Sequence, residues 1–347
     1  MRATVRDVAR LAGVSPTTVS NVVNGLVPVS TETRVRVERA LSALDYVPNL
    51  SARGLRNGRS GVIALALPDL STPYSAVLAH HIVRAATERG WSVQIEETGL
   101  GSRREAELLS RARANLVDGL ILSPVRLETS AVRRGVSLPP VVLIGEVDQP
   151  SADHVWIDNI AAARAITELL LAYGHRRIAV LGVRNTATSR LREQGYRVAL
   201  ASANLPTYGA MEISCPTKWT PDVGYEATRT WLTDHEPPEA LFAFTDSLAL
   251  GALHALSESG LRVPEDVSVV GYDDVPEAAH YTPPLTTVGF DKQAFAATVL
   301  DQLSTRIADP SAPVTSRTIA FQLMQRDSVA RLDSGGGRAL ATPVVTM

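Results

Sequence analysis

Residues 4–25 read TVRDVARLAGVSPTTVSNVVNG, and this stretch predicts two short helices joined by a tight turn. Thr4, followed three residues later by Asp7, has the form of a capping box, in which side chain and backbone satisfy each other at a helix N-terminus. Gly13 suits the left-handed conformation that ends a helix. Ser15 is a second N-cap, and the proline after it fits the first helical position, where its missing N–H costs nothing. The pattern indicates a helix-turn-helix.

A third helix is expected to begin after its N-cap, Ser30. Its inner face is predicted to comprise Val35, Val37, Ala40, Leu41 and Leu44. The second helix is expected to bury its valines and to present short polar groups on the opposite side, which can reach base edges or phosphates in a DNA major groove.

Charge is divided unevenly along the chain. The first 60 residues carry nine arginines against four acidic residues, a net charge of +5, whereas the whole chain carries -2, which leaves -7 for the remainder. A small basic segment attached to an acidic body indicates a module that binds a polyanion. Three short helices can also dock another protein, but the basic excess favours DNA.

Length and composition exclude several classes of protein. A chain of 347 residues suggests two or three domains, and 45% hydrophobic with 20% charged residues excludes wholesale disorder. No apolar run is long enough to span a bilayer, and the N-terminus lacks the apolar core of a secretory signal. The single cysteine, Cys215, excludes a disulfide framework and fits a reducing cytoplasm.

From Gly61 onward, buried strands alternate with helices, which is typical of a doubly wound parallel α/β sheet. Strands are expected at Val62–Leu67, Ser92–Glu96, Gly119–Leu122, Val141–Ile144, His154–Ile157, Ile178–Leu181, Ala240–Phe244 and Val267–Val270. Helices are expected at Ser75–Arg89, Arg103–Ala114, Ile160–Leu171, Arg190–Ala203, Gly224–Asp234 and Leu248–Ser259. Some 270 residues exceed one such sheet, so we expect two stacked subdomains with a ligand site between them, beyond the C-terminal ends of the strands.

Sequence motifs for catalysis are scarce. The chain has no phosphate-binding loop and no G-x-S-x-G nucleophile elbow. Gly99-Leu100-Gly101 fails as a dinucleotide fingerprint because Arg104 stands where the third glycine belongs. The seven histidines show no metal-ligand spacing. We therefore predict a protein that is not an enzyme, with no catalytic residue, metal or cofactor.

The N-terminal motifs together resemble the headpiece and hinge of lactose-repressor (LacI) family transcription regulators. The matching patterns are D-V-A-x-x-A-G-V-S, T-V-S-x-V-x-N, V-S-x-x-T-R, L-x-Y-x-P-N and a hinge A-R-x-L, all in order. The resemblance implies a headpiece over residues 1–47 and a hinge over residues 48–60. It places Pro16, Thr17 and Asn21 at base-reading positions, where asparagine suits adenine. Leu55 matches the leucine that wedges into the minor groove.

The remaining residues of the implied DNA interface lie in the same helices and in the hinge. They are Thr4, Ser15, Thr18, Ser20, Asn24, Arg53 and Arg56, with Arg59 as a further phosphate contact. Gly54 lowers the stability of a hinge helix, because glycine costs about 1 kcal/mol in a helix. The hinge helix is therefore expected to form only on DNA.

The body resembles the family's sensor domain, which is itself similar to periplasmic sugar-binding proteins. The strings LPDLSTPYSAVLAHHI, YGHRRIAVLG, SRLREQGY and SVVGYDD carry the likeness, which implies an effector-binding and dimerisation domain over residues 61–331. The resemblance places Tyr74, Arg192, Trp219, Thr245 and Asp273 in the effector cleft, with Asp69 and Asp158 as weaker candidates. The chemistry suits vicinal hydroxyls, because a guanidinium and carboxylates make charge-assisted hydrogen bonds and aromatic faces stack on a ring.

Structural alternatives exist for several of these residues. Tyr74 and Trp219 are alternatively core aromatics, and Arg192 and Asp273 a structural ion pair. We expect Asp246 to cap the helix that follows it.

The leading hypothesis is a dimeric transcription regulator that acts as a repressor, as most members of the resembled family do. It is expected to bind a near-palindromic operator in double-stranded DNA and to be controlled by a small-molecule effector such as a sugar. The sequence does not choose between an inducer and a corepressor. The alternatives are a small-molecule binding protein with a vestigial headpiece and a doubly wound enzyme. Residues 332–347 have no heptad pattern, so we expect a disordered tail and a dimer rather than a tetramer.

Overall fold

The computed structural model describes residues 3–24, 27–46, 59–99, 101–114, 116–126, 131–132, 138–147, 149–206, 211–332 and 338–340. The chain divides into two compact units, Met1–Ser60 and Gly61–Met347. They are called the N-terminal unit and the C-terminal unit below.

The N-terminal unit contains three helices, α1 (Val5–Ala12), α2 (Pro16–Asn24) and α3 (Thr31–Ala43). The predicted caps are present. The Thr4 side chain accepts from the Asp7 amide while the Asp7 carboxylate accepts from the Thr4 amide, and Gly13 ends α1 with a φ of 65°. The Oγ of Ser15 accepts from the Thr18 amide at 3.1 Å, and Ser30 accepts from the Thr33 amide in the same way at 3.2 Å.

A small apolar core holds these helices together. It contains Val8, Ala9 and Ala12 of α1, Val19 and Val22 of α2, and Val37 and Ala40 of α3. Val35, which the sequence pattern assigned to the inner face, is instead 38% exposed. The reason is helical geometry: at about 100° per residue, position 35 lies about 200° away from position 37.

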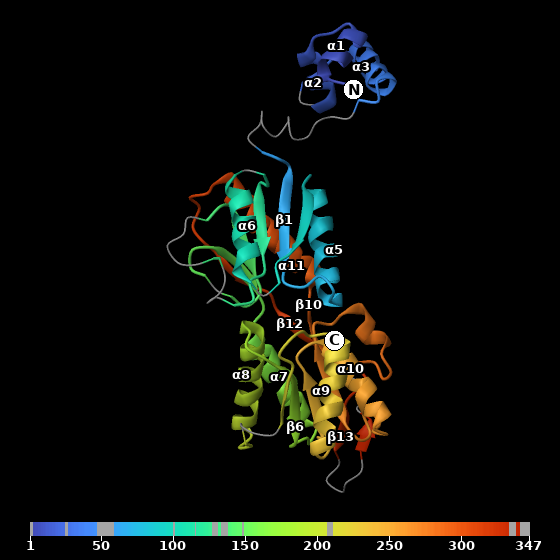
Figure 1. Ribbon diagram of the computed structural model, residues 1–347, viewed down its shortest axis with the longest axis vertical. Helices are drawn as coiled ribbons and strands as arrows, with labels where there is room; N and C mark the ends of the chain where they lie inside the picture. Colours follow the sequence, from blue (N-terminus) through green and yellow to red (C-terminus); the bar gives the residue numbers. More distant parts are fainter. Residues whose placement is uncertain are drawn as a thin grey trace. The chain divides into compact units, whose positions relative to one another are not determined.

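The C-terminal unit contains two six-stranded sheets, each forming the centre of a lobe (Figure 1). The first-lobe sheet has the order β11-β5-β4-β3-β1-β2, and the second-lobe sheet has the order β12-β10-β9-β8-β6-β7. The first-lobe strands are β1 (Val62–Leu67), β2 (Ser92–Glu97), β3 (Gly119–Leu122), β4 (Val141–Ile144), β5 (Asp153–Trp156) and β11 (Ser316–Thr318). The second-lobe strands are β6 (Ile178–Val183), β7 (Glu212–Ser214), β8 (Ala240–Ala243), β9 (Ser268–Tyr272), β10 (Thr286–Phe290) and β12 (Phe321–Met324). All pairings within these sheets are parallel except that of β10 with β12.

Helices cover both faces of each sheet. The first-lobe helices are α5 (Pro73–Glu88), α6 (Ser102–Arg113) and α11 (Lys292–Ala308), and the second-lobe helices are α7 (Asn159–Ala172), α8 (Ala187–Ser202), α9 (Pro221–Asp234) and α10 (Asp246–Glu258). The packing of strand β1 on both of its faces explains why its sequence is almost entirely apolar. Ile63 and Leu65 pack with the core of α5 and α11, while Ala64 and Ala66 pack with the core of α6. A strand buried on both faces needs apolar residues at every position.

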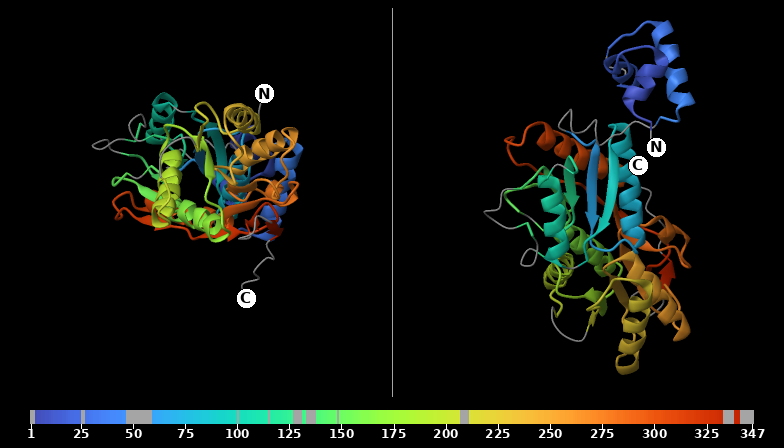
Figure 2. Two further views of the ribbon diagram at one scale, coloured as in Figure 1. Left: turned by 90° about the horizontal axis from the view of Figure 1, so that it is seen from below. Right: turned by 45° about the horizontal axis from the view of Figure 1, so that its top comes forward.

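The chain passes between the lobes three times. It leaves the first lobe after β5, returns after β10 to form α11 and β11, and leaves again to form β12. The orange-red α11 therefore lies among the blue and teal elements of the first lobe, and a second view of the ribbon agrees (Figures 1 and 2). This topology brings loops from distant parts of the sequence to the junction between the lobes.

The two-lobed α/β architecture confirms the predicted fold class, and all the predicted strands and helices are present with ends shifted by up to three residues. Not predicted were the second-lobe edge strand β7, the 3-10 helix η1 (Pro276–His280), and β10, α11, β11 and β12. The prediction that the tail is disordered from residue 332 is wrong at its start. Strand β13 (Ala330–Leu332) pairs antiparallel with β14 (Arg338–Leu340), which satisfies backbone groups in both segments.

Across the described residues, no helix is long and apolar enough to cross a membrane.

Candidate functional site

A cavity of about 260 Å³ lies between the two lobes, at the C-terminal ends of several strands. Leu67 ends β1 and Ile144 ends β4 in the first lobe, whereas in the second lobe Thr245 lies two residues after β8 and Asp273 directly follows β9. Parallel strands bring their C-terminal ends to one edge, where loops and helix N-termini gather. The cavity therefore lies where the fold class places ligands.

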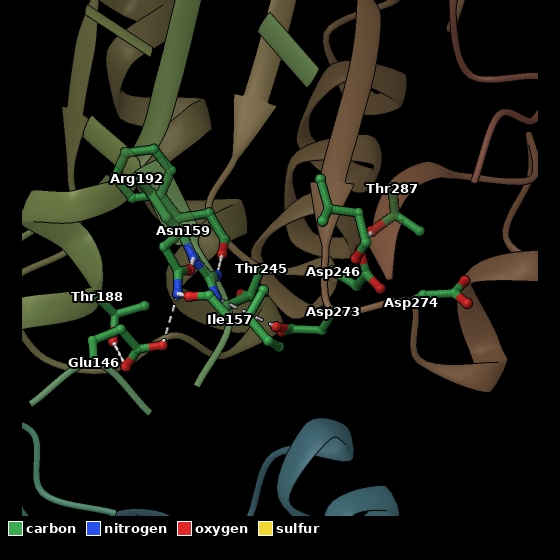
Figure 3. Close-up of polar contacts among 12 residues, drawn as sticks. Glu146, Ile157, Asn159, Thr188, Arg192, Thr245, Asp246, Asp273, Asp274 and Thr287 are labelled. Atoms are coloured by element: carbon green, nitrogen blue, oxygen red, sulfur yellow. Dashed lines mark hydrogen bonds and ion pairs between the residues drawn. The ribbon is translucent and has the colours of Figure 1, made fainter. Parts of the chain in front are cut away.

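Arg192, on α8, forms a buried part of the cavity wall (Figure 3). Its Nε donates to the Oδ1 of Asn159 at 2.7 Å, and its Nη1 donates to the carbonyl oxygen of Phe244. Its Nη2 lies 3.7 Å from the Oδ1 of Asp273, and its guanidinium stacks on the Tyr272 ring. The ion pair that was considered as the alternative to an effector-binding role is thus present, and it lies in the wall of the cavity.

Asp273 is 5% exposed and has a φ of 112°, a backbone conformation that side chains rarely adopt. Burial raises the pKa of its carboxyl to about 7, although the charge of Arg192 opposes the shift. A carboxyl that titrates near neutrality can accept a hydrogen bond from a bound hydroxyl when it is ionised and donate one to it when it is protonated. Strain of this kind is concentrated at functional sites.

Asp246 does not cap α10, contrary to the sequence-based expectation. Thr245 is the N-cap, since its Oγ1 accepts from the Leu248 amide at 3.2 Å. The buried Asp246 carboxylate instead accepts from the Val275 amide at 2.9 Å and from the Thr287 hydroxyl at 2.6 Å. Figure 3 shows Asp246 directed toward Thr287. Its role is therefore to hold the loop after β9.

The sequence analysis missed three polar residues near Arg192: Glu146 and Thr188, which line the cavity, and Asn159, which is buried behind Arg192. Glu146, which follows β4, accepts from the Asn159 amide group at 3.1 Å and from the Thr188 hydroxyl at 2.7 Å (Figure 3). Because Glu146 belongs to the first lobe and the other two to the second, these bonds cross the junction. The only sequence signal was position: Glu146 follows a strand, and Asn159 is the neighbour of the candidate Asp158.

Trp219 and Tyr74 both line the cavity, half-buried. The Trp219 Nε1 donates to the Gly182 carbonyl oxygen at 3.0 Å, and the guanidinium of Arg184 lies over its ring, 4.1 Å from the centroid. One face of Trp219 is therefore covered by a cation rather than open to a sugar. The Tyr74 ring meets Phe290 edge to face at 6.4 Å.

The two weaker effector-site candidates, Asp69 and Asp158, differ in their position relative to the cavity. Asp69 lines the cavity, accepts from the Ser71 amide at 2.9 Å, and lies 3.7 Å from the Nζ of Lys218. Burial acts to raise the pKa of Asp69, but the hydrogen bonds from Ser71 and the charge of Lys218 lower it below the ordinary value. Asp158 is not among the cavity-lining residues. Its carboxylate accepts from the Ala161 amide at 2.9 Å as the N-cap of α7.

Most of the candidate DNA-contacting residues that the structure describes lie on α2 or directly before it. Ser15, Pro16 and Thr17 are exposed at its start. Thr18, Ser20 and Asn21 are half-buried, and Thr4 is exposed at the start of α1. Asn24 ends α2, but its side chain is outside the described residues, as are Arg53, Leu55 and Arg56.

A helix-turn-helix unit joined to a two-lobed ligand-binding fold defines the class of ligand-responsive DNA-binding proteins. Comparison with known proteins agrees: residues 4–49 match the model described as bacterial regulatory proteins, lacI family, and residues 167–329 match the periplasmic binding protein-like domain. The chain is 31% identical over 330 residues to the ribose operon repressor of Escherichia coli (strain K12), which covers 94% of this chain and 99% of the relative.

Solved structures of full-length relatives are also similar. A lac repressor dimer bound to operator and the anti-inducer ONPF has a TM-score of 0.81 at 30% identity, covering 94% of this chain and 99% of that one. A complex of the transcriptional regulator CelR with cellobiose has a TM-score of 0.68 at 32% identity, covering 94% and 100%. The chain belongs to the lacI family of bacterial regulatory proteins, and it is a DNA-binding transcription regulator rather than an enzyme.

Proposed function

We propose that this regulator is a dimeric repressor that binds a near-palindromic operator, and that a small polyol bound between its lobes controls operator affinity. The observation that carries the effector site is the cavity wall in which Arg192 and Asp273 are exposed to the cavity, with Asn159 holding the Arg192 guanidinium from behind. Its donors and acceptors suit vicinal hydroxyls, because each hydroxyl can donate to a carboxylate and accept from a guanidinium.

The comparisons support a sugar as the effector, since one similar structure is a complex with cellobiose and another relative is named a ribose operon repressor. The dimer is supported by the similar lac repressor structure, which is a dimer on its operator. A two-fold dimer matches symmetric half-sites. A regulator of this kind acts on DNA, so the proposal places it in the cytoplasm.

On the DNA, Pro16, Thr17 and Asn21 are proposed to read base edges, with Ser15, Thr18 and Ser20 as neighbouring contacts. Leu55 is proposed to enter the minor groove and Arg53 and Arg56 to contact phosphates; all three remain predictions. Glu146 links the lobes through Thr188 and Asn159. A ligand that competes for these groups shifts the balance between lobe arrangements, and affinity for DNA follows.

A thermal-shift screen of the full-length chain against neutral sugars, polyols and nucleobases tests the effector site. A ligand present at 100 times its dissociation constant adds about 2.7 kcal/mol of stability. We expect at least one polyol to raise the melting temperature and Arg192→Met to remove that rise. A rise that survives in Arg192→Met would contradict the assignment of the site.

A further inference from the structure

Two arginines from opposite lobes, Arg184 and Arg126, lie beside the cavity, near enough for their charges to interact. Arg184 directly follows β6 in the second lobe and lines the cavity. Arg126 lies after β3 in the first lobe, next to the cavity-lining Val125. The lobes touch here, because the Ala187 amide donates to the Val125 carbonyl oxygen at 3.2 Å. A group bound at this point contacts both lobes.

The hydrogen-bonding capacity of the two guanidinium groups is largely unused. The Nη1 of Arg184 donates to the Thr217 carbonyl oxygen at 3.1 Å. Within the described part of the chain, however, the buried Nε atoms of Arg184 and Arg126 have no hydrogen-bond partner. Leaving a buried donor of a charged group without an acceptor costs more free energy than a typical neutral hydrogen bond contributes to stability. Both side chains are therefore suited to an acceptor supplied from outside the chain.

Their charges are also poorly compensated. Burial, together with the charge of Arg126, lowers the pKa of Arg184 to about 10, so the Arg184 guanidinium stays charged at neutral pH. Lys218 adds a third cation to the cavity lining, and Asp69 lies within ion-pair distance of it. Glu97 and Glu146 also line the cavity, but within the described residues only Asp69 lies within ion-pair distance of one of these three cations. The Arg192 charge, by contrast, is already matched by Asp273.

We propose that the effector carries an anionic group, a phosphate or a carboxylate, that binds between Arg184 and Arg126 while its hydroxyls bind at Arg192 and Asp273. This inference rests on the proposed function of the cavity as the effector site. The anion accepts hydrogen bonds from guanidinium groups of both lobes and offsets their repulsion. A charged effector therefore holds the lobes together more firmly than its neutral parent does.

Calorimetric titration of the full-length chain with matched ligand pairs tests the proposal. The pairs are glucose with glucose 6-phosphate and gluconate, ribose with ribose 5-phosphate, and fructose with fructose 1-phosphate. We expect at least one charged member to bind tenfold or more tightly than its neutral parent, with an affinity that falls as salt rises. The phosphate and carboxylate members show which anion the site takes.

Substitutions connect the effect to the two arginines. Arg184→Gln is expected to weaken the charged ligand by about 10- to 100-fold, Arg126→Gln to weaken it less, and both to weaken the charged ligand more than its neutral parent. Arg190→Gln, at an exposed position on α8, is the matched control and is expected to change neither affinity. Melting temperatures establish that the variants are folded.

The outcomes separate the two proposals. If neutral sugars bind as tightly as their charged relatives, or if Arg184→Gln weakens both equally, the anionic group is wrong while the effector site stands. If no member of any pair binds, the proposed function of the cavity fails with it.

Discussion

Arg192 is the residue on which the cavity wall depends most. It bonds Asn159 and the Phe244 carbonyl and lies beside Asp273, so its guanidinium both builds the wall and lines the cavity. Replacing Arg192 by Met leaves a buried carboxyl without its charged partner, a change that costs about 3–5 kcal/mol. We expect the lower end, because Asp273, with a pKa of about 7, takes up a proton readily.

Urea unfolding followed by circular dichroism measures this effect. Arg164→Met is the control, since Arg164 is half-exposed on α7, pairs with Glu168 across one turn, and should cost less than about 1 kcal/mol. Equal unfolding midpoints for Arg192→Met and the wild type would rule out the role assigned to Arg192.

The buried carboxyl of Asp246 predicts a pH dependence of stability. Burial and the neighbouring charge of Asp273 raise its pKa from 3.8 to about 8. Between these two pKa values the folded state keeps a proton that the unfolded state releases, so the free energy of unfolding falls as pH rises. Asp246→Asn lacks that proton but keeps the geometry, because its Oδ1 can accept from Val275 and its Nδ2 can donate to Thr287.

We therefore expect Asp246→Asn to become more stable relative to the wild type between pH 5 and pH 8. Unfolding midpoints in urea at several pH values measure the difference. A difference that stays constant across this range would show that Asp246 does not hold a raised pKa.

At the scale of elements, α9 and α10 pack closely enough to require glycine. A Cβ on Gly251 would overlap the carbonyl oxygen of Pro221 and lie 2.5 Å from the Tyr225 amide nitrogen. Gly251→Ala is expected to destabilise the C-terminal unit by about 1–3 kcal/mol, the usual cost of overpacking. Gly101→Ala, where a Cβ meets nothing within 4 Å, is the control, and differential scanning calorimetry compares them. A melting temperature for Gly251→Ala as high as that of the control would contradict this packing.

The caps of α2 give a second prediction at this scale. Ser15→Ala removes the hydroxyl that accepts from the Thr18 amide, which costs about 1 kcal/mol. We expect the N-terminal unit to melt at a lower temperature while ligand affinity is unchanged. Far-ultraviolet circular dichroism of the full chain measures the first and calorimetric titration the second; an altered ligand affinity would show that Ser15 does more than cap α2.

Sequence reasoning predicted the elements whose signal is local. Strands such as Val62–Leu67 and Val141–Ile144 are unbroken apolar runs, and Thr4 and Ser15 are caps read directly from residue type. Helix α11 was missed although Phe295, Val299 and Leu303 repeat at helical spacing. Its place in the first lobe depends on the chain returning after β10, and no local pattern encodes such a crossing.

The residues of the candidate site divide in the same way, into those with a local sequence signal and those whose position depends on the topology of the chain. Arg192, Trp219 and Asp273 could be placed in the cleft because their surrounding strings resemble the family. Glu146 and Arg184 were missed because each is a single polar residue in the loop after a strand, without a motif around it. Which strand ends face the cavity depends on where the chain crosses between the lobes.

At the scale of the whole molecule, the whole-chain charge of -2 combines +5 in the first 60 residues with an acidic remainder. A dimer brings about +10 to its operator. We expect operator affinity to fall about a thousandfold between 50 and 200 mM salt, as for proteins that make several phosphate contacts. Fluorescence anisotropy at a series of salt concentrations gives the slope, and a slope near zero would mean that phosphate contacts contribute little.

The most direct test is a fluorescence-anisotropy titration of the full-length chain against the DNA flanking its own gene, with and without the effector identified by calorimetry. We predict at least a tenfold preference over random DNA of the same length and at least a fivefold change in operator affinity when the effector is present. Removal of residues 1–60 should abolish DNA binding and leave effector affinity intact. No preference over random DNA, or an operator affinity that the effector leaves unchanged, would contradict a ligand-controlled regulator.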